Sequence, residues 1–204
     1  MSNDTAKAAP ARGRPIRHAD PRNIAIDLIP PDAICAEIGS WKGDFAARIV
    51  KLAGPRELHL IDPWRFNPAY PARWYGGNVA KSQADMDAIC LGVRSRFADN
   101  PEVRIHRCGS LDGSPQFLDC SLDWVYLDGD HSQQAVRDDL HAWYPKVKPG
   151  GFLVCDDYLW KDEFGAFSVK AAVDEFIAER AQADFEGALA ARGQYIIRIP
   201  ELRH

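Results

Sequence analysis

The sequence lacks the features that usually place a protein in a membrane, on a nucleic acid or outside the cell. No stretch approaches the roughly 18 consecutive apolar residues of a membrane span, and the N-terminus shows no apolar segment of a secretory signal. Basic residues are not in excess, since 25 Lys and Arg stand against 29 Asp and Glu. Nucleic-acid-binding and membrane-binding proteins usually carry a basic face. We therefore expect neither partner, and a small-molecule substrate instead.

Paired cysteines are also missing. The five cysteines are an odd number, contain no C-x-x-C motif and lie in part within apolar runs: Cys35, Cys90, Cys108, Cys120 and Cys155. Unpaired cysteines behave as small apolar side chains, so we expect these to pack in the core. Such a set is typical of a reducing compartment, and the sequence therefore predicts a cytoplasmic protein.

The length and the order of apolar segments predict one domain. A chain of 204 residues with 46% hydrophobic residues can bury one sizeable core. Residues 1–22 mix Ala, Pro, Gly and Arg without periodicity, which is typical of a flexible tail, and residues 23–204 form the expected domain. The sequence neither requires nor excludes a homo-oligomer.

Short apolar runs alternate with helix-length segments, which predicts a parallel sheet covered by helices on both faces. Strands are expected at 33–39, 57–62, 103–108, 123–128 and 152–157, and helices at 44–53, 82–98, 132–144 and 169–182. The segment Lys148–Gly151, "KPGG", is expected to be a stop before the strand at 152. Two closing strands, near 184–188 and at 194–199, are close enough in sequence to be antiparallel.

One connection is too long and irregular to be a tight turn. Residues 63–80, "PWRFNPAYPARWYGGNVA", contain three prolines, two adjacent glycines and five aromatic residues. We call this segment the aromatic loop. Loops of this length inside compact domains are usually lids or binding loops, so we expect it to cover a site, although an ordinary surface loop with anchoring aromatics is the alternative.

Polar and small residues follow the predicted strands, where open α/β sheets bind their ligands. "EIGSWKG" (residues 37–43) places two glycines four residues apart at a strand-to-helix turn, which allows a ligand to approach the backbone closely. It is not the G-x-G-x-x-G of dinucleotide-binding proteins. Asp62 ends the second strand and is positioned to accept both hydroxyls of a ribose. Together these features predict a nucleoside site.

Three carboxylates follow two consecutive strands. Asp128 ends one strand, and the adjacent pair Asp156 and Asp157 ends the next. If these strands are neighbours, the three side chains face one small volume, where hard cations such as Mg²⁺ find the oxygen ligands that they prefer. Asp130 has an alternative role, because it lies just before a predicted helix and could cap it.

The longest motif resembles a known family. "DWVYLDGDHSQQAVRDDLHAWYPKVKPGGFLVCDDY" (residues 123–158) is similar to the signature of class I S-adenosylmethionine-dependent methyltransferases related to the macrocin-type sugar and antibiotic O-methyltransferases, and "EIGSWKG" resembles their first motif. The resemblance implies an α/β, doubly wound, Rossmann-like sheet of seven strands, mostly parallel with an antiparallel last strand. It also implies a class I methyltransferase domain over residues 23–204.

The resemblance assigns cofactor and catalytic roles to individual residues. Around S-adenosylmethionine it places Glu37, Gly39, Ser40, Trp41, Gly43, Asp62, Trp64, Gly109, Ser110 and Asp128, with Trp64 either over the adenine or packed beneath the aromatic loop. It places Mg²⁺ on Asp128, Asp156 and Asp157. The base that removes the proton of the acceptor hydroxyl is either Asp130 or its neighbour His131.

These observations lead to a first hypothesis of Mg²⁺-dependent O-methylation of a hydroxyl on a small molecule. Two alternatives stay open. An NAD-dependent oxidoreductase shares the ribose-binding acid after a glycine turn, although the dinucleotide fingerprint is missing. A non-catalytic nucleoside-binding protein of the same fold is the other, because a fold alone does not establish an activity.

Overall fold

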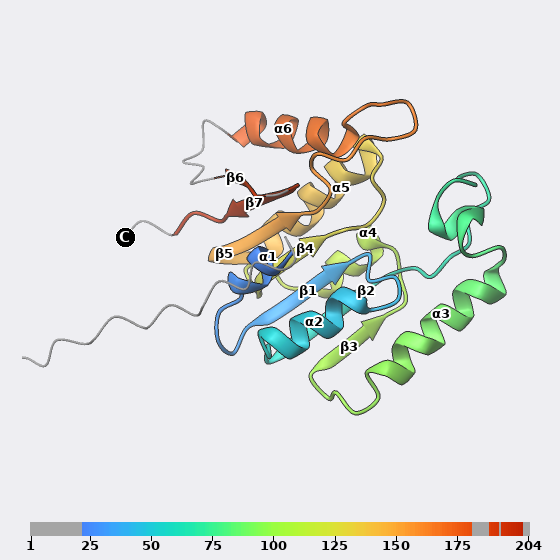
Figure 1. The fold of residues 1–204 in the computed structure, drawn as a ribbon. Helices are drawn as coiled ribbons and strands as arrows, with labels where there is room; N and C mark the ends of the chain where they lie inside the picture. Colours follow the sequence, from blue (N-terminus) through green and yellow to red (C-terminus); the bar gives the residue numbers. More distant parts are fainter. Residues whose placement is uncertain (1–21, 181–187, 192, 202–204) are drawn as a thin grey trace, which may run out of the picture.

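The computed structural model describes residues 22–180, 188–191 and 193–201, in which helices cover both faces of one seven-stranded sheet (Figure 1). The strands are β1 (Ile34–Ile38), β2 (Glu57–Ile61), β3 (Val103–His106), β4 (Leu122–Leu127), β5 (Val147–Cys155), β6 (Ala188–Ala191) and β7 (Gln194–Arg198). Their order is β3-β2-β1-β4-β5-β7-β6. Strand β7 is antiparallel to β5 and β6, and the other neighbours are parallel. The predicted doubly wound fold with an antiparallel last strand is confirmed.

The helices begin near the predicted positions. They are α1 (Asn23–Asp27), α2 (Asp44–Leu52), α3 (Gln83–Arg96), α4 (Ser110–Gly113), α5 (Gln133–Trp143) and α6 (Ser168–Arg180), with single helical turns at Trp74–Asn78, Ser114–Gln116 and Tyr144–Lys146. The hydroxyls of Ser82 and Ser132 accept a backbone N–H at the first turns of α3 and α5, which fixes where both helices begin. Among the described residues, no helix has the length and apolar character needed to cross a membrane.

Alternation along the strands divides the core into two layers. In β4, Trp124 and Tyr126 pack on one face against α1, α2 and α3, whereas Val125 and Leu127 pack on the other against α5 and α6. Successive strand side chains point to opposite faces, so a strand covered on both sides is apolar at every position. This is why the interior strands appear as continuous apolar runs in the sequence.

The expected stop at Lys148–Gly151 is wrong, because these residues lie inside β5. Opposite β4, Leu122 pairs with Val147 and Trp124 pairs with Phe152, so the segment forms a bulge in the ladder. Gly150, at φ +79°, permits the extra loop of backbone without breaking the strand.

Other expectations at the chain ends and cysteines need correction. The first closing strand begins at Ala188, later than expected, and residues 184–187 lie outside the described part of the chain. Residues 1–21 of the expected tail also lie outside it. Three cysteines are buried and Cys108 is half-buried, but Cys120 is exposed in the turn before β4, so core packing is wrong for that residue.

The strand order reverses at β1, which has β2 on one side and β4 on the other. The chain connections after these strands leave in different directions, and a crevice opens at their carboxyl ends. The residues that follow β1, β2, β4 and β5 therefore meet at one edge of the sheet.

Candidate active site

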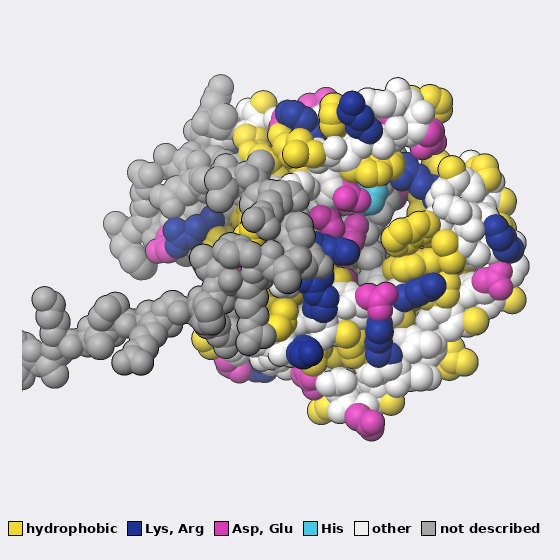
Figure 2. All heavy atoms as spheres, viewed as in Figure 1, with side chains coloured by type: hydrophobic (Ala, Val, Ile, Leu, Met, Phe, Trp, Pro, Cys, Tyr) yellow, Lys and Arg dark blue, Asp and Glu magenta, His cyan; other side chains and the backbone are white. Residues whose placement is uncertain are grey.

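A cavity of about 1180 Å³ lies at this edge of the sheet. Figure 2 shows the hollow between the body of the sheet and the aromatic loop, which Figure 1 draws as the teal segment between β2 and α3. Ligand sites usually measure about 300–1,000 Å³, so this cavity has room for a cofactor and a second molecule. Most of the predicted site residues line it, namely Glu37, Gly39, Ser40, Trp41, Asp62, Gly109, Ser110, Asp128, Asp130, His131, Asp156 and Asp157.

The last hydrogen bonds of the sheet position the acidic residues. The backbone N–H of Asp128 donates to the Ile38 carbonyl at 2.8 Å, and that of Asp156 donates to the Leu127 carbonyl at 2.9 Å. Each acid is thus held by the ladder one residue beyond a buried strand. Its backbone is as rigid as the sheet, while its side chain reaches the cavity.

The turn after β1 depends on Gly39. Its φ is +90°, a backbone conformation that residues with a Cβ rarely adopt. A Cβ there would also lie 2.0 Å from the backbone oxygen of Asp128. The turn can therefore pass directly against the end of β4 only with glycine. Gly43, at φ +73°, does not line the cavity; a Cβ there would lie 2.8 Å from the ring of Phe97, so its role in the structure is to begin α2 against α3.

Asp62 organises the nucleoside side of the cavity. Its two carboxylate oxygens accept the backbone N–H groups of Trp41 at 3.0 Å and Trp64 at 2.7 Å. Burial raises the pKa of Asp62 to about 6, although both hydrogen bonds lower it. A carboxylate has about four acceptor positions, so Asp62 can still accept two ligand hydroxyls.

Trp64 is not a wall of the cavity. Its side chain is fully buried in the core, and its indole N–H donates to the Trp41 carbonyl at 2.8 Å. Of the two alternatives for Trp64, the structure shows packing beneath the aromatic loop. Its contribution to the site is to hold Trp41, which does line the cavity and whose positive φ of 47° bends the turn toward Asp62.

Glu37 is a buried acid with an unsatisfied oxygen. It is 2% exposed, and its Oε2 atom has no hydrogen-bond partner within the described residues. Burial, followed by the nearby charge of Asp128, raises the pKa of Glu37 well above its usual range. An orphaned buried carboxyl oxygen costs free energy, and it indicates a place where a ligand with an N–H or O–H donor binds.

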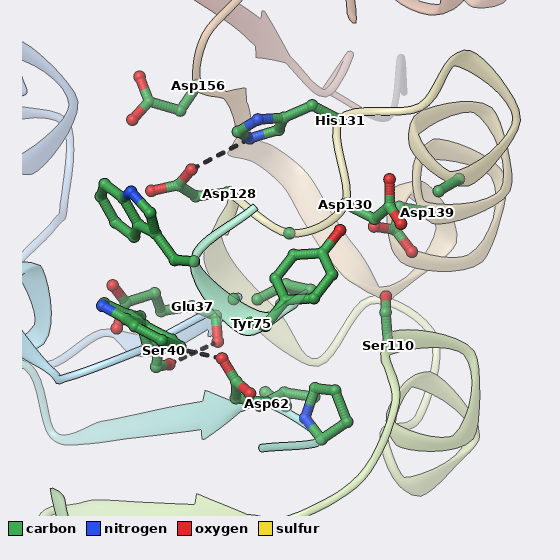
Figure 3. A pocket seen from close by; sticks show the side chains of 18 of the residues that line it. Glu37, Ser40, Asp62, Tyr75, Ser110, Asp128, Asp130, His131, Asp139 and Asp156 are labelled. Atoms are coloured by element: carbon green, nitrogen blue, oxygen red, sulfur yellow. Dashed lines mark hydrogen bonds and ion pairs between the residues drawn. The ribbon is translucent and has the colours of Figure 1, made fainter. Parts of the chain in front are cut away.

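Asp128, His131 and Asp157 form a second cluster on the same cavity, and Figure 3 shows the first two of them side by side. One ligating atom of each lies within 4.8 Å of the others. Nε2 of His131 is 3.4 Å from Oδ1 of Asp128, and Nδ1 is 3.7 Å from Oδ2 of Asp157. These are ion-pair distances without a directed hydrogen bond, since the buried Nε2 atom has no hydrogen-bond partner in the described chain. The cluster has the donor atoms of a cation site.

The described group whose donor atoms lie within 4.8 Å of one another contains His131 and not Asp156, whose role as a metal ligand stays a prediction. Asp156 accepts a hydrogen bond from the hydroxyl of Tyr126 and lies 3.8 Å from the guanidinium of Arg22. Asp157 has a positive φ of 55°, which turns its side chain toward His131. The two adjacent carboxylates thus separate to different partners, which reduces their mutual repulsion.

The comparisons with known proteins agree with this geometry. A family described as "Methyltransferase domain" matches residues 36–158, which includes both clusters. The chain belongs to this methyltransferase family. S-Adenosylmethionine is the cofactor that this membership supports.

Solved structures related to this methyltransferase have the same fold. The O-methyltransferase NovP is 20% identical, with a TM-score of 0.61 over 89% of this chain and 79% of that one. A Corynebacterium glutamicum protein is 18% identical, with a TM-score of 0.59 over 89% and 79%. Spermidine synthase from Thermotoga maritima is 14% identical, with a TM-score of 0.53 over 85% and 55%. At these identities the likeness shows the fold alone.

A curated relative covers a short segment. "Uncharacterized protein R132" of Acanthamoeba polyphaga mimivirus is 36% identical over 58 residues, which is 28% of the methyltransferase and 25% of the viral protein. The match spans about a quarter of that relative's length, so it does not indicate what this chain does.

The nucleoside side of the cavity fits S-adenosylmethionine. The cofactor carries ribose hydroxyls and an ammonium group, which are donors and a cation, and the cavity offers Asp62 and the orphaned oxygen of Glu37. Gly39 leaves the backbone open beside them. The donor pattern of the ligand and the acceptor pattern of the site are complementary.

Gly109 and Ser110 line the cavity at the start of α4, where the resemblance places the adenine. The hydroxyl of Ser110 is already engaged, because it accepts the indole N–H of Trp143 at 2.8 Å. Its contribution is therefore to hold the loop in place. The adenine role of both residues stays a prediction.

Asp130 is not the helix cap that was one alternative for it. Ser132 caps α5, and Oδ1 of Asp130 accepts the backbone N–H of Ser132 at 2.8 Å. The hydroxyl of Tyr75, from the aromatic loop, lies beside the Asp130 carboxylate, and burial, followed by the charge of that carboxylate, raises the pKa of Tyr75. Figure 3 shows Asp130 beside Tyr75, with Asp139 next to it. Asp130 is thus fixed at the cavity wall.

Sequence reasoning missed several charged residues of the cavity wall, among them Asp139 and Arg22. Asp139 is 6% exposed, and burial raises its pKa to about 7; its position on the apolar stripe of α5, between Val136 and Trp143, was a signal that periodicity could have detected. Arg22 was assigned to the tail, yet it lies 3.8 Å from Asp128 and from Asp156. Arg22 belongs to no motif or periodic pattern, so the sequence did not indicate that it lies at the cavity.

The aromatic loop contributes only part of its aromatic residues to the cavity. Trp74 and Tyr75 line it, Phe66 packs on the core, and Tyr70 is on the surface. A second connection, residues 156–167 between β5 and α6, contributes Trp160. The cavity is therefore bounded by two loops.

The pKa of Asp62 predicts a pH dependence of cofactor binding. The carboxyl is ionised above about pH 6, and protonation removes acceptor positions for the ribose hydroxyls. We expect the affinity for S-adenosylhomocysteine to fall by about tenfold from pH 7 to pH 5, because the ionised fraction of a carboxyl with a pKa near 6 falls by about that factor over this range. Calorimetry across this range measures it.

The matched control is Asp62→Asn, which cannot ionise and is expected to bind more weakly by about 1–3 kcal/mol at pH 7. The difference between the two profiles isolates Asp62 from the other acids of the cavity. Parallel profiles would show that Asp62 does not contact the nucleoside.

Proposed function

We propose that the methyltransferase transfers a methyl group to a hydroxyl of a small molecule with the help of a bound divalent cation. The observation that supports this most is the cluster of Asp128, His131 and Asp157, which shares one cavity with the cofactor turn. The resemblance of residues 123–158 to the macrocin-type O-methyltransferases supports the same reaction. We propose neither a nucleic-acid nor a membrane partner.

The chemistry of the cluster fits a divalent cation. Two carboxylates and one imidazole offer oxygen and nitrogen donors, and the unsatisfied Nε2 atom of His131 lacks the partner that a buried nitrogen requires. Carboxylates suit Mg²⁺ and Mn²⁺, and an imidazole favours the softer ion of the pair. We therefore extend the predicted Mg²⁺ to Mn²⁺, with Asp128, His131 and Asp157 as the protein ligands.

The residues of the chain divide the work of the reaction. When bound, S-adenosylmethionine supplies an electrophilic methyl group, and a divalent cation supplies positive charge that lowers the pKa of a hydroxyl. Asp130 then removes the hydroxyl proton, because its carboxylate is fixed on the cavity wall while His131 is occupied between two aspartates. The two loops orient the acceptor, and such positioning accounts for much of the rate gain in a displacement reaction.

Calorimetric titration with Mg²⁺ and Mn²⁺ in the presence of S-adenosylhomocysteine tests the cation site. We expect one ion to bind to the wild type, and Asp157→Asn to weaken it by at least about tenfold, the lower end of the loss seen when groups behind metal ligands are changed. The neighbouring Asp156→Asn is the matched control and is expected to have the smaller effect.

A wild type that binds no divalent ion would remove the metal from the proposal. A larger effect of Asp156→Asn than of Asp157→Asn would restore Asp156 as the ligand. Transfer of the methyl group from labelled S-adenosylmethionine to a panel of hydroxylated acceptors tests the reaction itself.

The alternative functions have less support. Family membership does not favour an NAD-dependent oxidoreductase, and a fluorescence titration with NADH would detect one. A non-catalytic nucleoside-binding protein has no use for the second cluster or for a fixed Asp130. The five free thiols support a reducing compartment, and we propose the cytoplasm.

A further inference from the structure

We propose that the methyl acceptor carries an oxyanion, a carboxylate or a phosphate, that binds to the guanidinium of Arg73, and a flat ring that lies against the tryptophans of the cavity. This inference rests on the proposed O-methylation for the reacting hydroxyl. The anion site itself is argued from the contacts of Arg73.

The guanidinium of Arg73 is largely buried yet poorly paired. Its side chain is 20% exposed and lines the cavity. Among the described residues it makes no hydrogen bond, and its ion pair with Glu163 spans 3.9 Å to a half-exposed carboxylate. A guanidinium has five N–H donors, and buried charged groups are normally paired and hydrogen-bonded. Its donors are therefore available to a ligand in the cavity.

Trp160 holds this arginine next to the reaction centre. The Cζ atom of Arg73 lies 4.5 Å from the centroid of the Trp160 ring, and the other neighbour of that ring is His131, with centroids 5.4 Å apart. A guanidinium stacked on an aromatic face keeps its N–H edge free for a planar anion. Arg73 and His131, a member of the Asp128–His131–Asp157 cluster, thus both contact the Trp160 ring. An acceptor can therefore bind with its hydroxyl at the cluster and its anion at Arg73.

Exposed aromatic surface lies in the same part of the cavity. Trp74 is 58% exposed and lines the cavity, and its ring centroid is 5.8 Å from that of Trp41. Tyr75, whose hydroxyl lies beside the proposed base Asp130, follows Trp74 in the aromatic loop. An indole left open to solvent within a polar cavity provides a face on which a planar ring stacks. The second molecule that the volume admits is thus best matched by an aromatic or otherwise flat compound.

Charged residues of both signs line the cavity. Figure 2 shows Lys and Arg side chains around its opening, and the cavity-lining basic residues are Arg22, Lys42, Arg48, Arg65 and Arg73. Ten acidic residues line the same cavity, so its summed charge does not attract an anion, and the proposed anion site depends on the donors of Arg73 itself. Some of these acids, such as Asp128 and Asp157, follow the strand ends where the cofactor and the cation are proposed to bind, whereas others are on helices α2, α4 and α5, namely Asp44, Asp112 and Asp138.

Matched acceptors test the proposal. With 3,4-dihydroxybenzoate and 3,4-dihydroxybenzamide, which differ in charge but share both hydroxyls, we expect the wild type to prefer the acid by about tenfold or more in kcat/KM, the scale of hydrogen bonds to a charged group. Arg73→Gln should abolish this preference and leave the amide rate within about threefold, and Arg73→Lys should restore part of it. Arg94→Gln, an exposed arginine on α3, is the control for loss of one positive charge.

Binding measured without turnover separates the two proposals. Calorimetry of the S-adenosylhomocysteine complex with benzoate, phenyl phosphate and benzamide shows whether an oxyanion binds and which one binds more tightly. If an anion binds through Arg73 while neither dihydroxy compound is methylated, the anion site stands and O-methylation fails. If the acid and the amide are methylated equally, or Arg73→Gln lowers both rates alike, the anion site is refuted.

Discussion

Asp130→Asn is expected to lower kcat by about 10²–10⁴-fold, the usual contribution of a positioned general base. Asparagine keeps the size of the side chain and can still accept the backbone N–H of Ser132, but it cannot take a proton. The loss should therefore appear in kcat. Affinity for S-adenosylhomocysteine should stay within about twofold, because the residues proposed to bind the nucleoside are at the ends of β1 and β2. Single-turnover methyl transfer measures the rate, and calorimetry measures the affinity.

Two variants make the interpretation of Asp130 specific. Asp99→Asn, in the exposed turn after α3, is the control for removing one carboxylate from the surface. His131→Gln should weaken cation binding before it changes the chemical step, because His131 lies between Asp128 and Asp157. The base would instead be His131 under two joint outcomes. Asp130→Asn would keep the rate of methyl transfer, and His131→Gln would lose that rate while still binding the cation.

Gly39→Ala is expected to destabilise the protein by about 3–5 kcal/mol, among the larger effects of a single substitution. The added Cβ would lie 2.0 Å from the backbone oxygen of Asp128, and alanine also disfavours a φ of +90°. The neighbour is backbone at the end of a buried strand, so it cannot move aside without breaking the β1–β4 ladder. Urea unfolding with and without S-adenosylhomocysteine measures the loss, and cofactor binding should fall with it.

Gly92→Ala is the matched control for the same chemical change. Gly92 is exposed within α3, and a Cβ there meets no atom within 4 Å. Because glycine is a poor helix former, this variant should be more stable by about 0.5–1 kcal/mol. If both glycine variants unfold like the wild type, the turn at Gly39 must be more adaptable than its contacts indicate.

Patterns along the sequence predicted the fold well because the sheet is covered on both faces. Buried parallel strands such as β4 contain continuous apolar runs, here residues 124–127. Ser82 and Ser132 mark the beginnings of helices by a local hydrogen bond. Such signals depend on residues close in sequence. The stop expected at Lys148–Gly151 failed because glycine and proline there form a bulge, and a bulge is decided by the partner strand.

The nucleoside side of the site was predictable for a similar reason. Residues that follow parallel strands meet at one edge whatever the details of packing, so Glu37 and Asp62 could be placed together on the cavity. The buried position of Trp64 could not be predicted, because a tryptophan two residues past a strand can turn either to the ligand or to the core. The hydrogen bond of its indole with Trp41 decides this, and it joins two different loops.

The sequence by itself therefore determined the doubly wound sheet, the edge at which ligands bind and the set of acids gathered there, since each follows from local periodicity and from strand direction. Only the tertiary structure decided which acids act together. The left-handed backbone of Asp157 turns it to His131, while Tyr126 and Arg22, from distant parts of the chain, hold Asp156. Side-chain direction depends on such long-range partners, and no periodicity in the sequence records them.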